Sequence, residues 1–246
     1  SFDNDCHLLM LTKAGFIKRT SLSAFSKIRS NGLIAINLED GDALTWVRLS
    51  KEGDSVLIGS RTGMAIHFRL DINELRPLGR TARGVKSMNL REGDNLVSMD
   101  VLTSDLVDKL AKIEDGAKEI DENAEVNSSD GPWVLIASAF GLGKRVPVTQ
   151  FRLQKRAGMG LRAIKFRIKD DVLVCLNVLG EGEELLFVTE KGVIVRTNAD
   201  KISQQSRAAT GVKLQKLDEG DHLSEVVLVP REQLEEIDQI SSENEN

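Results

Sequence analysis

Three arginines stand at one place relative to a following glycine, four residues before it. They are Arg80, Arg156 and Arg207, and the glycines are Gly84, Gly160 and Gly211. Two residues after the same glycines stand Lys86, Arg162 and Lys213. Cationic side chains are the donors that hold phosphate oxygens, and phosphate contact supplies most sequence-independent affinity for nucleic acid. The repeated spacing therefore predicts a surface that holds a polyanion.

The first copy of this pattern departs from the others. Ile28 and Ile34 stand where the other copies have cations, and Lys27 and Arg29 flank the first of these isoleucines. A single basic residue in a loop is usually just solvated surface. Basic residues at the same position of several repeats instead favour contact with one common partner. The glycines have a simpler explanation, because tight turns need residues that accept positive φ. We therefore expect the glycines to shape the scaffold and the cations between them to contact the partner.

The cations belong to a unit that occurs four times. Each copy has an apolar β-prone run, a short turn that ends in glycine, and a second run. The copies read LLMLTKAGFIKRT (8–20), VLIGSRTGMAIHF (56–68), VLIASAFGLGKRV (134–146) and LLFVTEKGVIVRT (185–197). A second glycine follows in each copy, at Gly32, Gly84, Gly160 or Gly211. Ten residues after this second glycine stands an aspartate: Asp42, Asp94, Asp170 or Asp221. We expect these aspartates to form turns rather than to catalyse or bind metal.

Short strands of even spacing, joined by glycine and aspartate turns, are typical of radially repeated β-sheets. We predict an all-β fold, a propeller-like array of about four four-stranded blades. The predicted domain covers residues 1–230, with repeats at about 6–50, 54–102, 133–180 and 183–230. An acidic insert at 103–130 interrupts the repeats, and an acidic tail occupies 231–246. Leu106, Leu110 and Ile113 recur at helical spacing, so the insert is expected to be partly a short helix and partly disordered.

The net charge of −5 is unevenly distributed along the chain. Residues 103–130 carry nine acidic residues and three lysines, and residues 218–246 carry ten acidic residues and one arginine. The remaining 189 residues therefore have a net charge of +10. A basic body with separable acidic segments indicates a polyanionic partner, and we expect the acidic segments to compete with that partner for the basic surface.

Other classes of function find little support in the sequence. No apolar run approaches the roughly 18 residues of a membrane helix, so no membrane partner is expected. Cys6 and Cys175 lie far apart without a metal-binding spacing, and the three histidines are scattered. FGLGKR (140–145) lacks the spacing of a phosphate-binding loop. We therefore expect no metal, no cofactor and no catalytic nucleophile.

The units resemble the C-terminal domain of the DNA gyrase A subunit, a β-pinwheel related to propellers. The resemblance is carried by GFIKRTSLSAFSKIRSNGLIAINLEDGD, by GMAIHF with RPLGRTARGVKSMNL, and by GVIVRTNADKISQQSRAATGVKL. It covers nearly the whole chain except the acidic insert and tail. LIAINL and the insert resemble the cyanobacterial and plant-organelle members, which implies the bacterial cytoplasm or a plant chloroplast or mitochondrion as the location.

The resemblance implies a module that bends duplex DNA around a basic rim to support ATP-dependent negative supercoiling. The implied partners are duplex DNA, the catalytic core of the gyrase A subunit, and the gyrase B subunit, which binds the ATP. The implied DNA-binding residues are the basic residues of the repeated loops and strands: Lys18, Arg19, Lys27, Arg29, Arg80, Arg83, Lys86, Lys144, Arg145, Lys155, Arg156, Arg162, Lys165, Arg196, Arg207 and Lys213.

Two departures from the family pattern bear on this interpretation. The chain has no tyrosine, the residue with which the family cleaves DNA. The chain is therefore not expected to be an enzyme itself, whereas its parent is expected to be a type II DNA topoisomerase. Only QKRAGMG (154–160) approaches the gyrase box Q-[RK]-R-G-G-[RK]-G. The related domain of the topoisomerase IV A subunit, or else a protein-binding β-propeller, therefore stays as an alternative.

Overall fold

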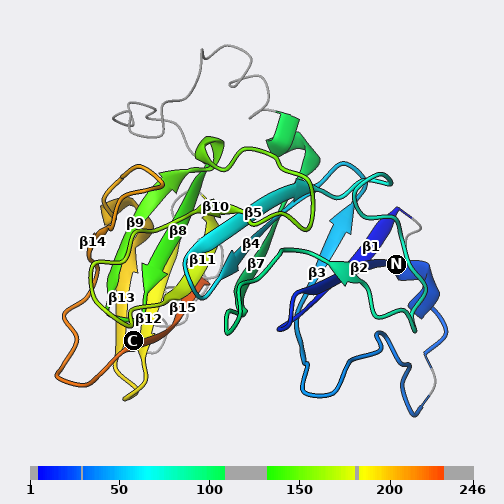
Figure 1. The fold of residues 1–246 in the computed structure, drawn as a ribbon, viewed down its shortest axis with the longest axis horizontal. Coiled ribbons are helices and arrows are strands. Elements are labelled where there is room, and N and C mark those ends of the chain that lie inside the picture. Colours follow the sequence, from blue (N-terminus) through cyan, green and yellow to red (C-terminus); the bar gives the residue numbers. More distant parts are fainter. Residues whose placement is uncertain (1–4, 29, 109–131, 181–182, 230–246) are drawn as a thin grey trace, which may run out of the picture. The chain divides into compact units, whose positions relative to one another are not determined.

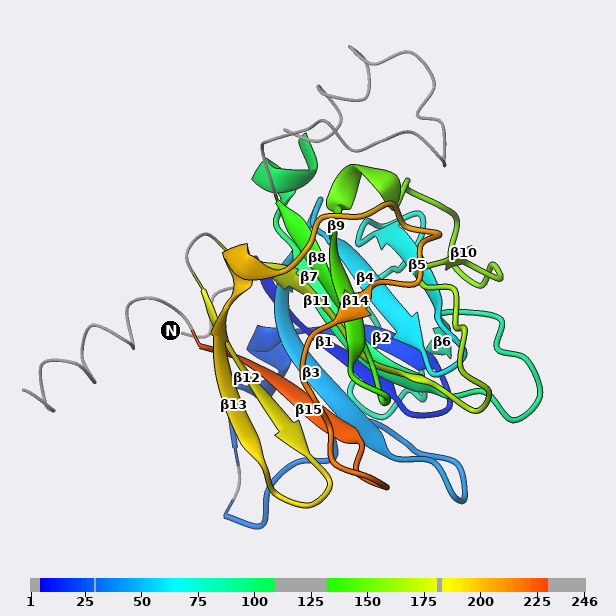
Figure 2. The same cartoon turned by 90° about the vertical axis from the view of Figure 1, so that its left-hand side faces the viewer.

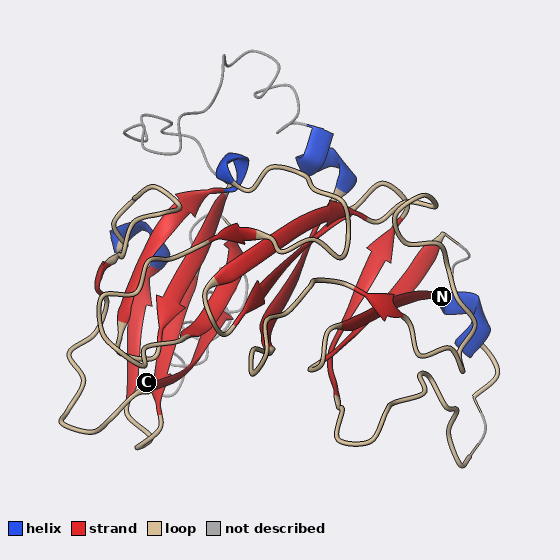
Figure 3. Ribbon diagram, in the orientation of Figure 1, coloured by secondary structure: helices blue, strands red, loops and turns tan. Residues whose placement is uncertain are grey.

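The regular structure of the chain is almost entirely β-strand. The computed structural model describes residues 5–28, 30–108, 132–180 and 183–229 (Figures 1 and 3). Its strands form four antiparallel sheets in two compact units. Unit 1 comprises residues 1–121 and 149–163, and unit 2 comprises residues 122–148 and 164–246. The expected all-β fold of repeated sheets is confirmed.

Unit 1 contains two four-stranded sheets. The first has the order β3-β1-β2-β6, from β1 (Cys6–Thr12), β2 (Phe16–Ser21), β3 (Leu44–Lys51) and β6 (Val85–Lys86). The second has the order β10-β5-β4-β7, from β4 (Ser55–Ser60), β5 (Met64–Arg69), β7 (Leu96–Leu102) and β10 (Leu161–Arg162). A 3-10 helix, η1 (Leu22–Phe25), follows β2, and residues 104–108 are helical at the start of the acidic insert. Leu110, Ile113 and the rest of the insert up to 131 lie outside the described residues.

Unit 2 contains a four-stranded and a three-stranded sheet. The first has the order β11-β8-β9-β14, from β8 (Trp133–Ser138), β9 (Leu142–Pro147), β11 (Leu173–Leu179) and β14 (Val212–Lys213). The second has the order β13-β12-β15, from β12 (Glu184–Thr189), β13 (Ile194–Asn198) and β15 (Leu223–Val229). Two 3-10 helices, η2 (Val148–Gln150) and η3 (Ala199–Lys201), follow β9 and β13. The fourth sheet thus has one strand fewer than expected among the residues described.

The outer strand of each four-stranded sheet comes from the next repeat along the chain. β6 pairs with β2, β10 pairs with β5, and β14 pairs with β9. Each of these short strands begins directly after the second glycine of its repeat. Consecutive repeats are therefore joined by backbone hydrogen bonds, which is the arrangement of a β-pinwheel.

The turns agree with the sequence prediction except at one aspartate. The four glycines that end the hairpin turns all have positive φ, from 75° to 92°. Asp42 and Asp94 accept backbone N–H groups from the neighbouring hairpin turns. In the third copy Asp171 does this, accepting from the N–H of Phe140 at 3.1 Å, rather than the expected Asp170. Asp170 has a φ of 65° and takes the place that glycine has in the other copies, because the third copy is one residue longer here.

Each unit has its own apolar core. Buried side chains in unit 1 include Ile58 and Phe68, and those in unit 2 include Leu135 and Phe187. Burial of such side chains removes apolar surface from water, so the cores hold each unit's sheets together. Among the residues described, the helices are all too short to cross a membrane.

Candidate nucleic-acid interface

Two of the predicted DNA-binding lysines are buried and bind the backbone of the protein itself. Lys18 and Lys144 stand three residues after the turn glycines of equivalent hairpins, and both are fully buried. The Nζ atom of Lys18 lies 2.5–3.0 Å from the carbonyl oxygens of Ala35, Gly79, Arg80 and Ala82. The Nζ atom of Lys144 donates at 2.6–2.8 Å to the carbonyl oxygens of Ser206, Arg207 and Ala209. We call each of these arrangements a carbonyl clasp.

Both carbonyl clasps fix a loop of the following repeat, and the clasp of Lys18 also holds the carbonyl of Ala35 in its own repeat. Burying a charged ammonium is costly unless polar atoms replace the lost water, and the carbonyl oxygens do this. Burial lowers the pKa of Lys18 to about 8. Burial, and next the neighbouring Arg207 guanidinium, lower the pKa of Lys144 to about 7. These lysines therefore position the loops around 79–84 and 206–211, and neither is placed to reach phosphate.

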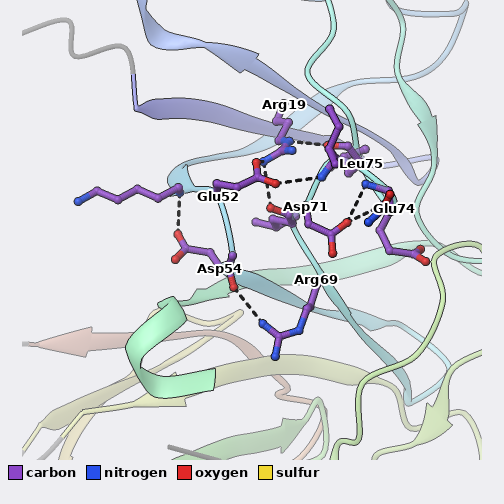
Figure 4. A network of polar contacts seen from close by, with 12 residues as sticks. Arg19, Glu52, Asp54, Arg69, Asp71, Glu74 and Leu75 are labelled. Atoms are coloured by element: carbon purple, nitrogen blue, oxygen red, sulfur yellow. Dashed lines mark hydrogen bonds and ion pairs between the residues drawn. The ribbon is translucent and has the colours of Figure 1, made fainter. Parts of the chain in front are cut away.

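The arginines that follow the two lysines are also bound internally. The Nε of Arg19 donates to the carbonyl of Leu75, and its Nη1 lies 2.7 Å from a carboxylate oxygen of Glu52 (Figure 4). The Nε of Arg145 donates to the carbonyl of Ile202 at 3.0 Å. Arg19 is fully buried and Arg145 is 8% exposed. The expectation that both contact DNA is therefore replaced by a structural role for each.

The second repeat fills the same two positions with Ile66 and His67. His67 is buried, and burial lowers its pKa, so the imidazole is neutral at pH 7. Its Nδ1 lies 2.6 Å from the carbonyl oxygen of Phe151, and its Nε2 lies 2.7 Å from the hydroxyl of Ser55. Phe151 stands nine residues before the second glycine of its repeat, as Leu75 and Ile202 do in theirs. One carbonyl position is thus bound in all three sheets, by arginine or by histidine.

The second glycines allow the incoming chain to lie against the preceding sheet. A Cβ atom on Gly84 would lie 2.6 Å from the carbonyl oxygen of Ile17. On Gly160 it would lie 2.5 Å from that of Ala65, and on Gly211 2.6 Å from that of Gly143. All three glycines also have positive φ. The expectation that these glycines shape the scaffold is confirmed, and the reason is close approach as well as turn geometry.

Lys86, Arg162 and Lys213 are exposed and occupy one repeated position. Each is the second residue of a short outer strand, β6, β10 or β14. Their partners in the sheets are also equivalent, since each is the first residue after a hairpin glycine: Phe16, Met64 and Leu142. Because side chains alternate between the faces of a strand, equal register places the three cations on the equivalent face of their sheets. We call these three residues the outer-strand cations.

The arginines four residues before the second glycines are not equally exposed. Arg207 is 5% exposed, so it cannot present its guanidinium to a large ligand as expected. Arg80 and Arg156 are half-buried. Arg156 donates from Nε to the carbonyl of Glu74 at 3.0 Å and from Nη1 to that of Lys86 at 2.5 Å. Arg156 therefore supports the strand that carries an outer-strand cation.

The remaining predicted cations are exposed, with one outside the described residues. Arg83 pairs with Glu39 and its guanidinium carbon lies 4.4 Å from the centre of the Phe16 ring. Arg196 on β13 pairs with Glu184. Lys27, Lys155 and Lys165 are exposed as well. Arg29 is not among the residues that the structure describes.

Counting further from the second glycine would have found cations that the sequence interpretation missed. Lys216 stands five residues after its glycine, as Lys165 does, and both are exposed. Arg91 and Arg167 stand seven residues after theirs and are exposed as well. The missed signal is an alternation of cations beyond the outer strands, most visible as KFRIK at 165–169.

Comparison with known proteins agrees with this architecture. The family model described as DNA gyrase C-terminal domain, beta-propeller, matches residues 7–51, 54–103, 132–174 and 183–230. The DNA gyrase A subunit of Synechocystis is 52% identical over 251 residues, covering 100% of this chain and 29% of that protein. The DNA gyrase A subunit of Staphylococcus epidermidis is 39% identical over 226 residues, covering 92% of this chain and 22% of that protein. The chain thus spans less than a third of these relatives.

Two solved structures share the fold. The C-terminal domain of DNA topoisomerase IV has a TM-score of 0.78 at 22% identity, covering 100% of this chain and 69% of that chain. A DNA gyrase A C-terminal domain has a TM-score of 0.71 at 26% identity, covering 94% of this chain and 68% of that chain. Three findings agree: each outer strand pairs with the preceding repeat, the family model matches most of the residues, and the relatives are gyrase A subunits. This chain belongs to the family of the DNA gyrase C-terminal beta-propeller domain.

Proposed function

We propose that this chain binds duplex DNA without regard to base sequence and bends it, as the C-terminal DNA-wrapping domain of a DNA gyrase. The observation that carries the proposal is the repeated, exposed position of Lys86, Arg162 and Lys213 on three outer strands. Contacts to phosphate oxygens position a protein on DNA but carry no base information directly. Cationic side chains carried by short strands, rather than by a helix lying in a DNA groove, suit this kind of contact.

The outer strands hold these cations in place before any ligand binds. Each strand is anchored by backbone pairing and by a glycine in close contact with the preceding sheet. Two of the three are further held by the carbonyl clasps of Lys18 and Lys144. Less backbone freedom is then lost on binding, which leaves more of the phosphate interaction as net affinity. Bending a short duplex costs about 1–6 kcal/mol, so several such contacts are needed to offset it.

The whole enzyme's activity is part of the same proposal. With no tyrosine in this chain, DNA cleavage falls to the catalytic core of the gyrase A subunit, whereas ATP hydrolysis falls to the gyrase B subunit. The wrapped segment would be presented to that core for strand passage and negative supercoiling. Identities of 52% and 39% to the A subunits of two gyrases support a gyrase as the parent enzyme.

The salt dependence of DNA binding tests the contact surface. The variant Lys86→Gln/Arg162→Gln/Lys213→Gln should lower the slope of log affinity against log salt by about 0.9 for each phosphate that is no longer neutralised. The control Arg48→Gln/Lys51→Gln/Lys201→Gln removes the same charge from exposed sites outside the outer strands and should change the slope less. Equal slopes for the two variants would remove the outer-strand cations from the interface.

A topological assay tests bending with a defined hand. The chain is bound to nicked circular DNA, the nick is sealed, and the linking number is measured after the protein is removed. Wrapping with a positive crossing predicts a positive shift that grows with protein added and is reduced in the outer-strand variant. Retained binding with an unchanged linking number would contradict wrapping and leave only a module that holds DNA.

A further inference from the structure

In the four-stranded sheets, a connecting segment of one repeat lies against the incoming loop of the next repeat. The segment follows the second glycine of its own repeat, and the loop precedes the second glycine of the next. In the second sheet the N–H of Asn89 donates to the carbonyl of Gly158 at 2.9 Å. In the third sheet, where β14 lies beside β9 (Figure 2), the N–H of Lys165 donates to the carbonyl of Ala209 at 3.3 Å. Asn89 and Lys165 both stand five residues after their glycines, so the two contacts are equivalent.

The first sheet makes this contact through an ion pair. Glu39 stands seven residues after the second glycine of its repeat, and it pairs with Arg83, which directly precedes the next second glycine. The guanidinium carbon of Arg83 lies 4.4 Å from the centre of the Phe16 ring. Phe16 is the residue opposite Lys86 in the sheet, so the ion pair lies beside an outer-strand cation.

The second and third sheets have the opposite charge at the position of Glu39. Arg91 and Arg167 stand seven residues after their second glycines, and both are exposed. Within the part of the chain that the structure describes, neither of these two arginines forms an ion pair. Their guanidinium groups are therefore open to an external anion, whereas that of Arg83 has a carboxylate beside it.

The residues that take the place of Arg83 in these two sheets are uncharged. They are Met159 and Thr210, directly before the second glycines of their repeats. The Nδ2 atom of Asn89 lies 3.4 Å from the Sδ atom of Met159, which places Arg91, two residues along, near the same loop. The two positions together are neutral in the first sheet, whereas they carry one positive charge in each of the other two.

We propose that Arg91 and Arg167 contact DNA phosphate beside the outer-strand cations of their sheets, and that Glu39 keeps Arg83 from doing so. The inference rests on the proposed function, because it adds contacts to the same surface. A carboxylate next to a guanidinium neutralises it and repels an approaching phosphate, whereas an unpaired guanidinium can donate two hydrogen bonds to phosphate oxygens. The second and third sheets then hold DNA more strongly than the first.

Removal of the carboxylate tests the first sheet. Glu39→Gln should make the slope of log affinity against log salt steeper by about 0.9, the value for one further phosphate neutralised. Asp40→Asn removes the same charge from an exposed side chain one residue further on and should change the slope less. An exposed ion pair contributes little to stability, so both variants should fold, which circular dichroism checks. Equal slopes for the two variants would overturn the role of Glu39.

A double-mutant cycle identifies the cation that Glu39 holds back. Arg83→Gln alone should change the salt slope little, because Glu39 already neutralises Arg83. In the Glu39→Gln background the same substitution should abolish the gain, so the effects of the two substitutions are not additive. A gain that survives Arg83→Gln would show that Glu39 acts on another group, and it would overturn the proposal for the first sheet.

The variant Arg91→Gln/Arg167→Gln tests the second and third sheets. It should lower the salt slope by about 0.9 for each phosphate that is no longer neutralised. Arg48→Gln/Lys201→Gln is the matched control, because it removes two exposed cations outside these segments. A slope equal to that of the control would overturn the inference, and the proposed function would stand if the outer-strand variant still lowers the slope. An outer-strand variant that leaves the slope unchanged would instead contradict the proposed function itself.

Discussion

At the scale of single residues, the notable feature is how differently neighbouring cations are used. Lys144 is buried against three carbonyl oxygens, whereas Lys213 on the strand beside it is exposed. A buried cation therefore joins one repeat to the next, whereas an exposed cation is placed where we propose that it contacts phosphate. The same division applies to Lys18 and Lys86 in the first sheet.

Replacing Lys144 should affect stability rather than ligand contact. Lys144→Met would leave three carbonyl oxygens without their donor, which should lower the free energy of unfolding by about 1–3 kcal/mol. Urea unfolding followed by circular dichroism measures this change. Lys165→Met removes an exposed lysine and should stay within about 0.5 kcal/mol of wild type. A DNA-binding salt slope that falls in folded Lys144→Met as far as in the outer-strand variant would contradict the structural role.

The lowered pKa of Lys144 predicts a definite pH dependence. Its folded pKa of about 7 lies below the ordinary lysine value of 10.5, so between these values the unfolded chain binds more protons than the folded chain. The contribution of Lys144 to the free energy of unfolding should therefore rise with pH above about 7. The measurement is the difference between wild type and Lys144→Met at about pH 6.5, 8 and 9, which should grow with pH. A difference that stays flat or shrinks would show that Lys144 keeps its proton in the folded state.

At the scale of elements, the short outer strands join successive repeats. β6, β10 and β14 contain two residues each, so their few backbone bonds alone would hold them weakly. Two further contacts hold each strand in place. The glycine just before the strand lies against the preceding sheet, and a carbonyl group nine residues before that glycine is bound by arginine or histidine. The strands can then carry exposed cations without losing their position.

Substitution of a second glycine should detach its outer strand. Gly84→Ala would place a methyl group 2.6 Å from the carbonyl oxygen of Ile17 and would strain a φ of 103°. We expect a loss of about 2 kcal/mol or more in the free energy of unfolding, and weaker amide protection of β6. Gly93→Ala is the control, because its φ of 75° brings a similar strain but no atom lies within 4 Å. Equal losses at the two positions would show that close approach to the preceding sheet contributes little.

At the scale of the whole molecule, charge is divided between the body and the acidic segments. The tail from 230 to 246 lies outside the described residues, whereas residues 223–229 form β15 of the fourth sheet. A deletion that began at 218 would therefore remove a strand as well as the acids. A tail deletion that tests charge alone must start after β15.

Deletion of residues 230–246 should strengthen DNA binding. The segment carries six acidic residues and one arginine, so its removal makes the chain more positive by five charges. Long-range repulsion of phosphate is screened by salt, so the gain in affinity should be largest at low ionic strength and should fade towards about 0.2 M. Fluorescence anisotropy with a labelled duplex measures it. The same-length tail with its six acidic residues changed to Gln and Asn should reproduce the gain, and an unaltered affinity in both would refute competition by the tail.

The amino-acid sequence by itself determined the repeats, the turns and the fold class. Glycine at positive φ and alternating apolar runs act locally, so LLMLTKAGFIKRT and its three counterparts identify hairpins without any distant contact. The charge division between body and acidic segments is likewise a property of the sequence. The register of Lys86, Arg162 and Lys213 could also be counted from the glycines before any fold was known.

Only the tertiary structure decided which cations are buried and which sheet each strand joins. Lys18, Arg19, Lys144, Arg145 and Arg207 have the same side-chain types as the exposed cations, and nothing local distinguishes them. The first four of these side chains are buried against carbonyl groups that lie about 50 to 65 residues away along the chain. The pairing of β6, β10 and β14 with strands of the preceding repeats likewise depends on contacts between distant segments. Hairpins follow from local backbone preference, whereas a buried charge and an exchanged strand exist only where distant segments meet.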